Sequence, residues 1–264
     1  MKFSLITVFS DFKNNIRGNA SAVVLLENQL DYKQMQAIAS DFNQPATTFL
    51  WKAIGEQAYH IRWFAPDAEI GLCGHGTMAA TAFLAKEKIN QHFVFNYEMG
   101  IICGKTDSKK ICSIELAEIP VIKEVEVPEV IKMGLGIKIK GFYQTSDKYI
   151  ILAENEEAVK NLKPDFSMLA KSDIFGYAVT AKGDLVDFVS RTLVPHVQQL
   201  EDHATGSSHA ALVPFWADRL HKNMLSSLQL SKRGGRFFCR LNDGIVQLSG
   251  DYEIIGEGVL CLNP

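Results

Sequence analysis

The stretch GHGTMAATAFLAKEK at residues 74–88 decides the fold, because it is nearly apolar on every side for about three turns, as expected of a helix surrounded by protein. A second such stretch, GSSHAALVPFWADRL, begins 132 residues later, at residue 206 against 74, which is half the chain. Each follows a Gly-rich turn, CGHGT at 73–77 and DHATGS at 202–207. This repetition predicts an internal duplication, in which each half wraps a curved sheet around one central helix.

Most of the other periodic segments are typical of strands, since they are short, rich in β-branched and aromatic residues, and punctuated by Gly, Asn and Asp. They lie at 57–65, 92–97, 110–116, 136–144, 148–153, 184–191, 235–241, 244–250 and 257–262. One amphipathic helix is expected at 31–42, where apolar residues recur with helical spacing and Asp31 can cap the N-terminus.

We therefore predict an α+β protein with two pseudo-symmetric domains, each a barrel-like, mostly antiparallel sheet wrapped around a central helix. The first domain is expected to comprise residues 1–118 together with a C-terminal strand at 252–264, and the second to comprise residues 119–251. The mixed segment 117–135 contains two prolines and alternating charge, which makes it the expected hinge.

Composition narrows the class of partner. The 264 residues, 47% hydrophobic and 22% charged, can bury a sizeable core. A net charge of −3 and a pI near 6.2 give no general attraction to nucleic acid or to anionic lipid. No segment approaches the ~20 apolar residues that span a bilayer, and the N-terminal run alternates like a strand and unlike a signal peptide. Expected partners are small molecules or further copies of the chain.

Five cysteines, odd in number and without CxxC spacing, indicate reduced thiols in a cytoplasmic protein and argue against disulfides or a zinc site. Metal catalysis is disfavoured further, because no HExxH motif or clustered carboxylates occur. The segment SKRGGRFFCR at 231–240 resembles a basic RNA-binding stripe. A hairpin turn at Gly234-Gly235 between two strands explains it more simply, because the whole chain is negative.

The starts of the two central helices are the candidate site. If both begin beside the interface between the halves, their unpaired N–H groups and positive dipole ends meet in one cleft, which suits a small carboxylate. Thr77, Thr205 and Ser207 would add hydroxyl donors there. The alternative is that these residues only cap their helices.

The ionisable residues at these helix starts include Cys73, His75 and Asp202. Removing a proton from carbon beside a carboxylate requires a positioned base, an acid, and donors for the enolate oxygen. His75 at a helix N-terminus is expected to be neutral and to act as donor or proton relay. A buried, hydrogen-bonded structural histidine is the alternative interpretation.

The combination of CGHGT, EDHATGS and RGGR, in this order and spacing, resembles the PhzF-like (phenazine-biosynthesis-like) isomerases of the diaminopimelate-epimerase fold, from Phe3 to about Gly258. The resemblance implies two pseudo-symmetric domains with an active site in the cleft between them, no cofactor, no metal, and a homodimer. The activity it implies is acid/base isomerisation of a cyclic dihydro-hydroxy amino acid.

The resemblance also assigns roles by position. His75, Asp202 and Ser207 match residues that line the family's catalytic cleft. Its anion-binding turns correspond to Gly74, Gly76, Gly206 and the adjoining amides, and its GNP turn to Gly18-Asn19, with Ala20 in place of the proline.

One position departs from the family. The segment FNQPATTFL at 42–50 aligns with N-L-S-E-T-A-F, and the family's proton-shuttling Glu then falls on Ala46. A methyl group cannot carry a proton. Two hypotheses remain open at this point: Asp202 or Cys73 replaces the missing base, or the protein has lost its activity and binds a small carboxylate as a sensor, carrier or interaction partner.

Overall fold

A computed structural model describes residues 1–53 and 58–261. The chain forms two compact units, Met1–Glu115 with Ser249–Pro264, and Leu116–Leu248. The domain limits expected from the sequence, 118 and 252, lie three residues beyond the observed limits of 115 and 249. The chain passes from one unit to the other within β8 (Ile111–Ala117) and again within β17 (Ile245–Val259).

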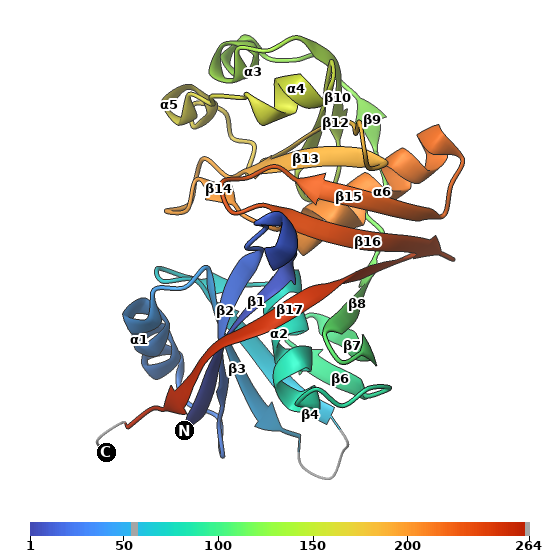
Figure 1. Ribbon diagram of the computed structural model, residues 1–264. Coiled ribbons are helices and arrows are strands. Elements are labelled where there is room, and N and C mark those ends of the chain that lie inside the picture. The colour runs from blue at the N-terminus through green and yellow to red at the C-terminus, as the bar shows by residue number, and fades with distance from the viewer. Residues whose placement is uncertain (54–57, 262–264) are drawn as a thin grey trace. The chain divides into compact units, whose positions relative to one another are not determined.

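The first unit is a closed barrel around α2 (Figure 1). The order β1-β2-β3-β4-β6-β7-β8-β17 closes on β1, and the pairs β2–β3 and β4–β6 are parallel. The strands not yet given are β1 (Lys2–Ser10), β2 (Asn19–Leu25), β3 (Ala46–Lys52), β4 (Ala58–Phe64), β5 (Glu69–Ile70), β6 (His92–Tyr97) and β7 (Gly100–Ser108). The helices are η1 (Phe12–Asn14), α1 (Tyr32–Phe42) and α2 (Gly74–Ala85).

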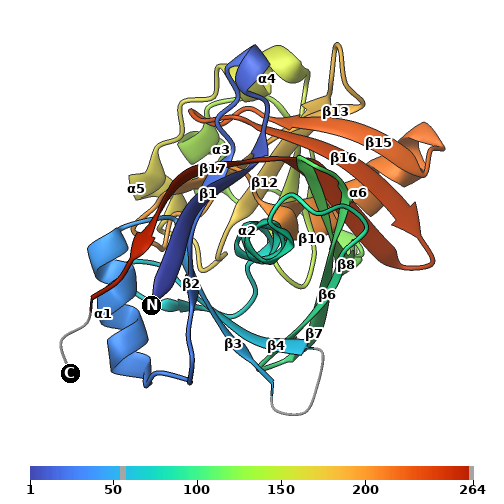
Figure 2. The same cartoon turned by 60° about the horizontal axis from the view of Figure 1, so that its bottom comes forward.

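Helix α2 occupies the middle of this ring, as Figure 2 shows in a view close to its axis. Its small residues allow the strands to approach closely from several sides: a Cβ on Gly104 of β7 would collide with the side chain of Thr81. Helix α1 covers the outer face of β3 instead, where Met35 and Ile38 pack with Phe49. Asp31 and Gln34 form a capping box at its start, which confirms the predicted helix and its cap.

The second unit repeats the plan. Its strand order is β9-β10-β11-β12-β13-β15-β16, with parallel pairs β11–β12 and β13–β15 at the places where the first unit has β2–β3 and β4–β6. The strands are β9 (Lys123–Glu124), β10 (Ile139–Gln144), β11 (Tyr149–Ala153), β12 (Tyr177–Lys182), β13 (Phe188–Leu193), β14 (Glu201–Asp202), β15 (Met224–Gln229) and β16 (Gly235–Asn242). The helices are α3 (Glu129–Leu135), α4 (Glu156–Lys160), α5 (Phe166–Leu169) and α6 (Gly206–Leu220). The duplicated α+β fold is thereby confirmed.

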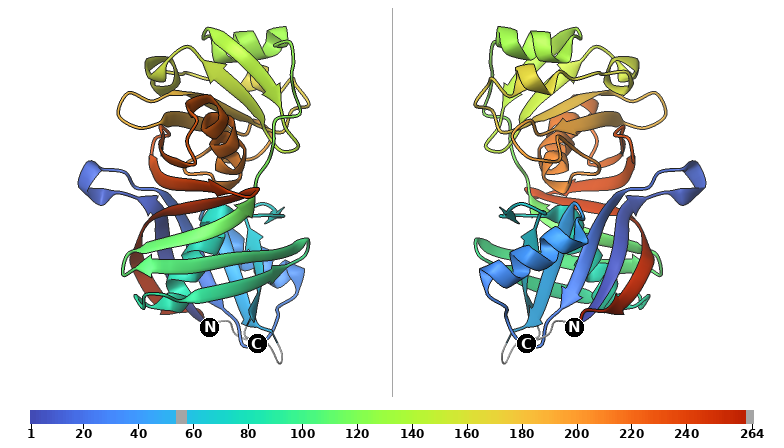
Figure 3. Two further views of the ribbon diagram at one scale, coloured as in Figure 1. Left: turned by 90° about the vertical axis from the view of Figure 1, so that its right-hand side faces the viewer. Right: turned by 90° about the vertical axis from the view of Figure 1, so that its left-hand side faces the viewer.

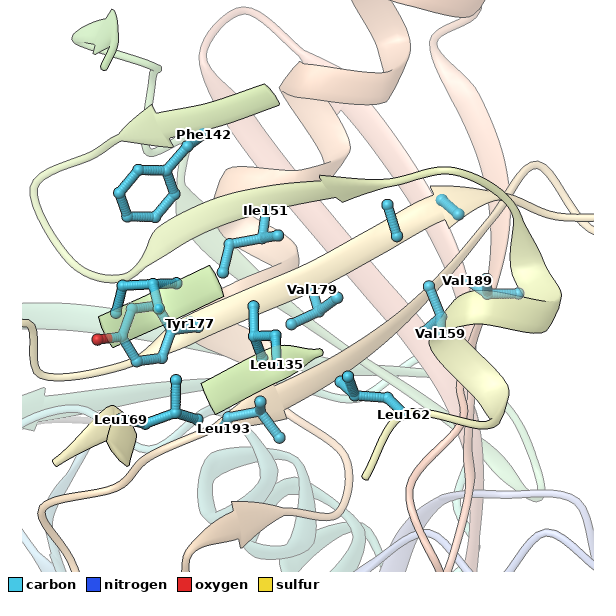
Figure 4. Packing of buried hydrophobic residues seen from close by; sticks show 13 residues of the cluster. Leu135, Phe142, Ile151, Val159, Leu162, Leu169, Tyr177, Val179, Val189 and Leu193 are labelled. Atoms are coloured by element: carbon cyan, nitrogen blue, oxygen red, sulfur yellow. The ribbon is translucent and has the colours of Figure 1, made fainter. Parts of the chain in front are cut away.

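Helix α6 is the central helix of this unit, and α3, α4 and α5 cover the other face of its sheet (Figure 3). Beneath these outer helices lies an apolar cluster shown in Figure 4, in which Leu135, Val159 and Leu169 meet Ile151 and Val179 of the sheet. The burial of this cluster holds the short helices in place, since helices of four to seven residues are not stable alone.

Several predicted boundaries are wrong. Segment 136–144 is not a strand throughout, because Gly136 has a φ of 60° and ends α3, which the sequence did not predict. The strand expected at 184–191 begins only at Phe188, after a turn. The two strands expected at 244–250 and 257–262 are parts of one continuous strand, β17, which ends at Val259. Residue 57 and residue 262 of the predicted strands lie outside the described residues.

In the described part of the chain, no helix combines the length and apolarity required to cross a membrane. None of the five cysteines, all of which lie within the described residues, forms a disulfide, and Cys73, Cys112 and Cys239 are buried. Burial raises the pKa of the Cys239 thiol to about 12, so this thiol stays protonated and behaves as a small apolar side chain.

Candidate active site

At the start of α2, a thiol, an imidazole and an amide lie in contact. Cys73 is the N-cap, and its Sγ accepts the N–H of Gly76 at 3.3 Å. The same sulfur lies 3.4 Å from Nδ1 and 3.7 Å from Nε2 of His75. Asn19, at the start of β2, brings its Nδ2 to 3.3 Å from His75 Nδ1. All three side chains are buried.

The network around Asn19 fixes the roles of these atoms. Asn19 Oδ1 accepts the N–H of Ala20 at 3.1 Å, so the group that faces His75 is Nδ2, which can only donate. His75 Nδ1 is then the acceptor, and a neutral ring carries its proton on Nε2. The sulfur is within reach of both ring nitrogens, so the thiol and the imidazole can exchange a proton.

The wall of this site is tightly packed and requires glycine. A Cβ on Gly76 would lie 2.6 Å from Trp63 Cδ1, 2.7 Å from Thr48 Oγ1 and 3.1 Å from the Cys73 sulfur. Thr77 does not point its hydroxyl outward as the sequence suggested; its Oγ1 donates to the carbonyl of Cys73 at 2.8 Å. The Thr77 hydroxyl is thus bonded within its own helix, and the residue that caps α2 is Cys73.

Ala46 is the first residue of β3 and is fully buried. It pairs with Ser21 in the parallel β2–β3 ladder, and it points to the same face of β3 as Thr48, two residues along. Ser21 Oγ and Thr48 Oγ1 lie 2.8 Å apart. The position therefore belongs to the polar, inward face of the barrel that also carries Asn19, but its own side chain is apolar.

The start of α6 in the second unit carries different groups. Its N-cap, Thr205, makes no side-chain cap bond, because the Thr205 hydroxyl instead accepts from Gln229 Nε2 at 3.1 Å. Gly206 and Ser207 follow, and Ser207 Oγ accepts a bond of 2.9 Å from Lys148 Nζ. Lys148 is itself buried and also pairs with Asp147 at 2.7 Å.

Asp202 ends the two-residue strand β14, where it pairs with Thr192 and is half-buried. Its carbonyl accepts from Gln229 Nε2 at 2.6 Å. Its neighbour His203 is also half-buried, and burial lowers the pKa of that imidazole, with Asp202 opposing the shift and Arg233 adding to it. His209, further along α6, is fully buried, and burial lowers its pKa to about 4.

The structure thus brings together Cys73, His75 and Asn19 in the first unit, and Thr205, Gly206 and Ser207 in the second. Lys148 could not be identified from the sequence, because it lies 59 residues before Ser207 and no spacing rule connects a hairpin turn with a later helix start. The same holds for Gln229, which fixes the Thr205 turn from β15. Within residues 1–53 and 58–261 there is no group of three or more His, Cys, Asp or Glu side chains that could hold a metal ion.

Comparison with known proteins agrees with this architecture. A family model described as phenazine biosynthesis-like protein (PhzC-PhzF) matches residues 6–263. An uncharacterized isomerase of Pseudomonas aeruginosa is 34% identical over 265 residues, covering 100% of this chain and 99% of the relative. A crystal structure of a phenazine biosynthesis protein of the PhzF family from Enterococcus faecalis is 34% identical and superimposes with a TM-score of 0.90 over 99% of both chains.

More distant structures share the fold alone. A hydroxyproline epimerase from Agrobacterium vitis superimposes with a TM-score of 0.67 at 11% identity, over 98% of this chain and 91% of that one. The family model, the relatives named isomerases and the duplicated fold agree, which is sufficient for an assignment. The chain belongs to the PhzC-PhzF family of phenazine biosynthesis-like proteins and has an isomerase-like function.

Proposed function

We propose that the protein is a cofactor-independent isomerase or epimerase that moves a proton on a small cyclic carboxylate, of the hydroxy- or amino-acid type. The observation that carries the proposal is the buried contact between the Cys73 sulfur and the His75 ring at the start of a helix, with Sγ 3.4 Å from Nδ1 and 3.7 Å from Nε2. A sulfur that accepts a backbone N–H at a helix N-terminus is favoured as a thiolate, and an adjacent imidazole can take or return its proton.

In the proposed reaction, a base removes the proton from a carbon near the substrate carboxylate, and the electron pair moves onto an enolate oxygen. Hydrogen-bond donors stabilise the developing negative charge. A protonated group then delivers a proton to the same carbon from the other face, or to another carbon, so that no proton or electron is gained or lost overall. Cys73 and Asp202 are the candidate bases, and His75 is the candidate relay.

A second function is supported by Ala46. The apolar side chain stands at the position where the resemblance places the principal base. Loss of a general base costs about 10²–10⁴-fold in rate. A protein that lacks it could therefore bind a small carboxylate without converting it, as a sensor or carrier.

Deuterium incorporation tests these proposals. The protein is incubated in D2O with a panel of small cyclic hydroxy and amino acids, and the mass of each acid is followed. Exchange that disappears in Cys73→Ser or in Asp202→Asn assigns the base. Cys112→Ser is the matched control, because it makes the same change at a buried thiol of β8 whose pKa burial raises far above its usual range.

The Ala46→Glu variant separates the two functions. If the wild type exchanges no acid and Ala46→Glu gains exchange, the site is intact and lacks only the base, which supports the binding function. If the wild type exchanges and Cys73→Ser and Asp202→Asn both keep full exchange, neither residue is the base and the proposed assignment is wrong.

A further inference from the structure

Lys148 is a buried cation whose purpose the fold does not explain. It lies in the turn before β11, and its stem passes Gly176, where an added Cβ would be 3.3 Å from Lys148 Cγ. Only 6% of the residue is exposed. Burying an ammonium is costly unless it is paired, and its Nζ donates to Asp147 Oδ2 at 2.7 Å and to Ser207 Oγ at 2.9 Å.

The bond to Ser207 dictates how that hydroxyl is used. An ammonium has three N–H donors and no acceptor, so Ser207 Oγ must accept from it. The hydroxyl proton of Ser207 is then directed elsewhere, and no acceptor for it occurs within residues 1–53 and 58–261. The third N–H of Lys148 has no oxygen or nitrogen acceptor in that part of the chain, and the Phe175 ring lies near the ammonium, its centroid 5.7 Å from Nζ. Two donors therefore remain available at the start of α6.

The backbone N–H groups in the first turn of α6 are also available as donors. Thr205 would normally cap α6 through its hydroxyl, but Gln229 occupies that oxygen, and no side chain caps the first turn. In the first unit, by contrast, the Cys73 sulfur caps α2 through the N–H of Gly76. A half-buried hydroxyl, a buried ammonium and uncapped amides all present donors at the start of α6.

We propose that Lys148 is a positioning and specificity residue: it holds the Ser207 hydroxyl as a hydrogen-bond donor and makes the start of α6 selective for the carboxylate of the substrate over a neutral group. This inference rests on the proposed function, which supplies the carboxylate. Asp147 sets the strength of the effect, because its carboxylate partly neutralises the ammonium while remaining more exposed than Lys148, with side-chain exposures of 29% and 7%.

The proposal predicts opposite signs for changes at two neighbouring residues. Lys148→Met retains an apolar stem but removes the charge and frees Ser207 to donate or accept, so it should weaken carboxylate binding. Asp147→Asn removes the competing negative charge and should strengthen it. A purely structural ion pair would weaken binding, or leave it unchanged, in both variants.

Calorimetric titration with 2-aminobenzoate and 2-aminobenzamide tests this, because the two probes differ only in carboxylate against carboxamide. We expect the wild type to bind 2-aminobenzoate more tightly than 2-aminobenzamide. Lys148→Met should lower the affinity for 2-aminobenzoate about tenfold or more and leave the affinity for 2-aminobenzamide unchanged. Lys148→Arg should restore part of the preference, and Ser207→Ala should lose it. Lys140→Met, at an exposed lysine that bonds the Glu154 carbonyl, is the matched control.

The outcomes separate the inference from the function on which it rests. If the wild type does not distinguish the probes, there is no carboxylate site here, and the proposed substrate class and the inference both fail. If the wild type distinguishes them and Lys148→Met does so equally well, only the inference fails. Should Lys148→Met not fold, Asp147→Asn and Lys148→Arg decide: weaker carboxylate binding in Asp147→Asn, or none of the preference in Lys148→Arg, overturns the role of Lys148.

Discussion

The starts of α2 and α6 share one local structure but carry different side chains. In each unit an arginine on the strand before the turn pairs with a glutamate on a two-residue strand: Arg62 with Glu69 at 2.6 Å, and Arg191 with Glu201 at 2.7 Å. The helix N-cap follows the glutamate by four residues in both cases, from 69 to 73 and from 201 to 205. Even the bond from the fourth residue after the N-cap back to its carbonyl recurs, at 2.8 Å, from Thr77 and from His209.

The chemistry on this shared frame has diverged. The start of α2 carries a thiol, an imidazole and an amide, and its first turn is capped by the sulfur. The start of α6 carries a hydroxyl held by a buried ammonium, and its first turn is uncapped. The two units therefore share the contacts that position a helix start, whereas the few polar side chains at that start differ. We expect the α2 residues to move protons and the α6 residues to hold the substrate.

The largest expected effect tests this division of labour. His75→Ala should lower kcat by about 10²–10⁴-fold with little change in KM, because it removes a proton-transfer group. Ser207→Ala should chiefly raise KM, because it removes a ground-state contact. Steady-state kinetics on an acid identified by deuterium exchange measures both, with His196→Ala, at an exposed histidine, as the control. The reverse pattern would contradict the assignment of roles.

The second prediction concerns packing at equivalent positions. Trp63 and Thr192 both follow the paired arginine and oppose the second residue of the short strand. The large Trp63 faces Gly76, whereas the small Thr192 faces Ser208, with Thr192 Oγ1 2.9 Å from Ser208 Oγ. Gly76→Ser should therefore cost about 3 kcal/mol of unfolding free energy, because the added side chain collides with the indole.

Adding Trp63→Thr to Gly76→Ser should recover part of that loss, since it recreates the pair of the second unit. Urea unfolding of the two single variants and the double variant forms a double-mutant cycle. Additive losses would show that the two positions do not share one packing constraint.

The third prediction concerns pH. His209 is fully buried, stacks on Phe237 with ring centroids 3.7 Å apart, and has a pKa lowered to about 4, against about 6.5 when unfolded. Below pH 6.5 the unfolded chain binds a proton here that the folded chain does not, so stability falls as pH falls toward 4. We expect about 2 kcal/mol to be lost at this site between pH 7 and pH 5.

Comparing variants isolates this contribution from that of the other titrating groups. The pH dependence of urea unfolding should be shallower in His209→Gln than in the wild type, whatever the loss of stability at pH 7. Thr77 makes the corresponding bond in the first unit and cannot titrate, so Thr77→Val should leave the slope unchanged. An equal slope in His209→Gln and in the wild type would exclude a buried neutral histidine.

The sequence predicts the elements with strong periodicity and the helix starts, but not what contacts them. The two central helices are predictable because they are apolar around their whole circumference, and α1 because its apolar residues recur with helical spacing after Asp31. The short α3 was missed because seven residues that contain Gly134 have little helical preference of their own and rely on packing against Leu169. Lys148 and Gln229 were missed because their partners are distant in sequence, and pairing at long range depends on strand register.

The smallest effect should distinguish the two arginine pairs themselves. Arg62 and Glu69 are each about one quarter exposed, with side-chain values of 25% and 26%, whereas Arg191 and Glu201 have 11% and 18%. Arg191 also donates to the carbonyl of Leu162 at 2.6 Å, which holds the guanidinium in place for the glutamate. We therefore expect a coupling energy below about 1 kcal/mol for the Arg62 pair and a value about 1 kcal/mol larger for the Arg191 pair.

Double-mutant cycles with Arg→Met and Glu→Gln at 0.05 M and 0.5 M salt measure both coupling energies. The Arg62 pair should lose more of its coupling energy at high salt because it is more exposed. Equal coupling energies with equal salt dependence would mean that the difference in burial does not affect the strength of the two arginine–glutamate pairs.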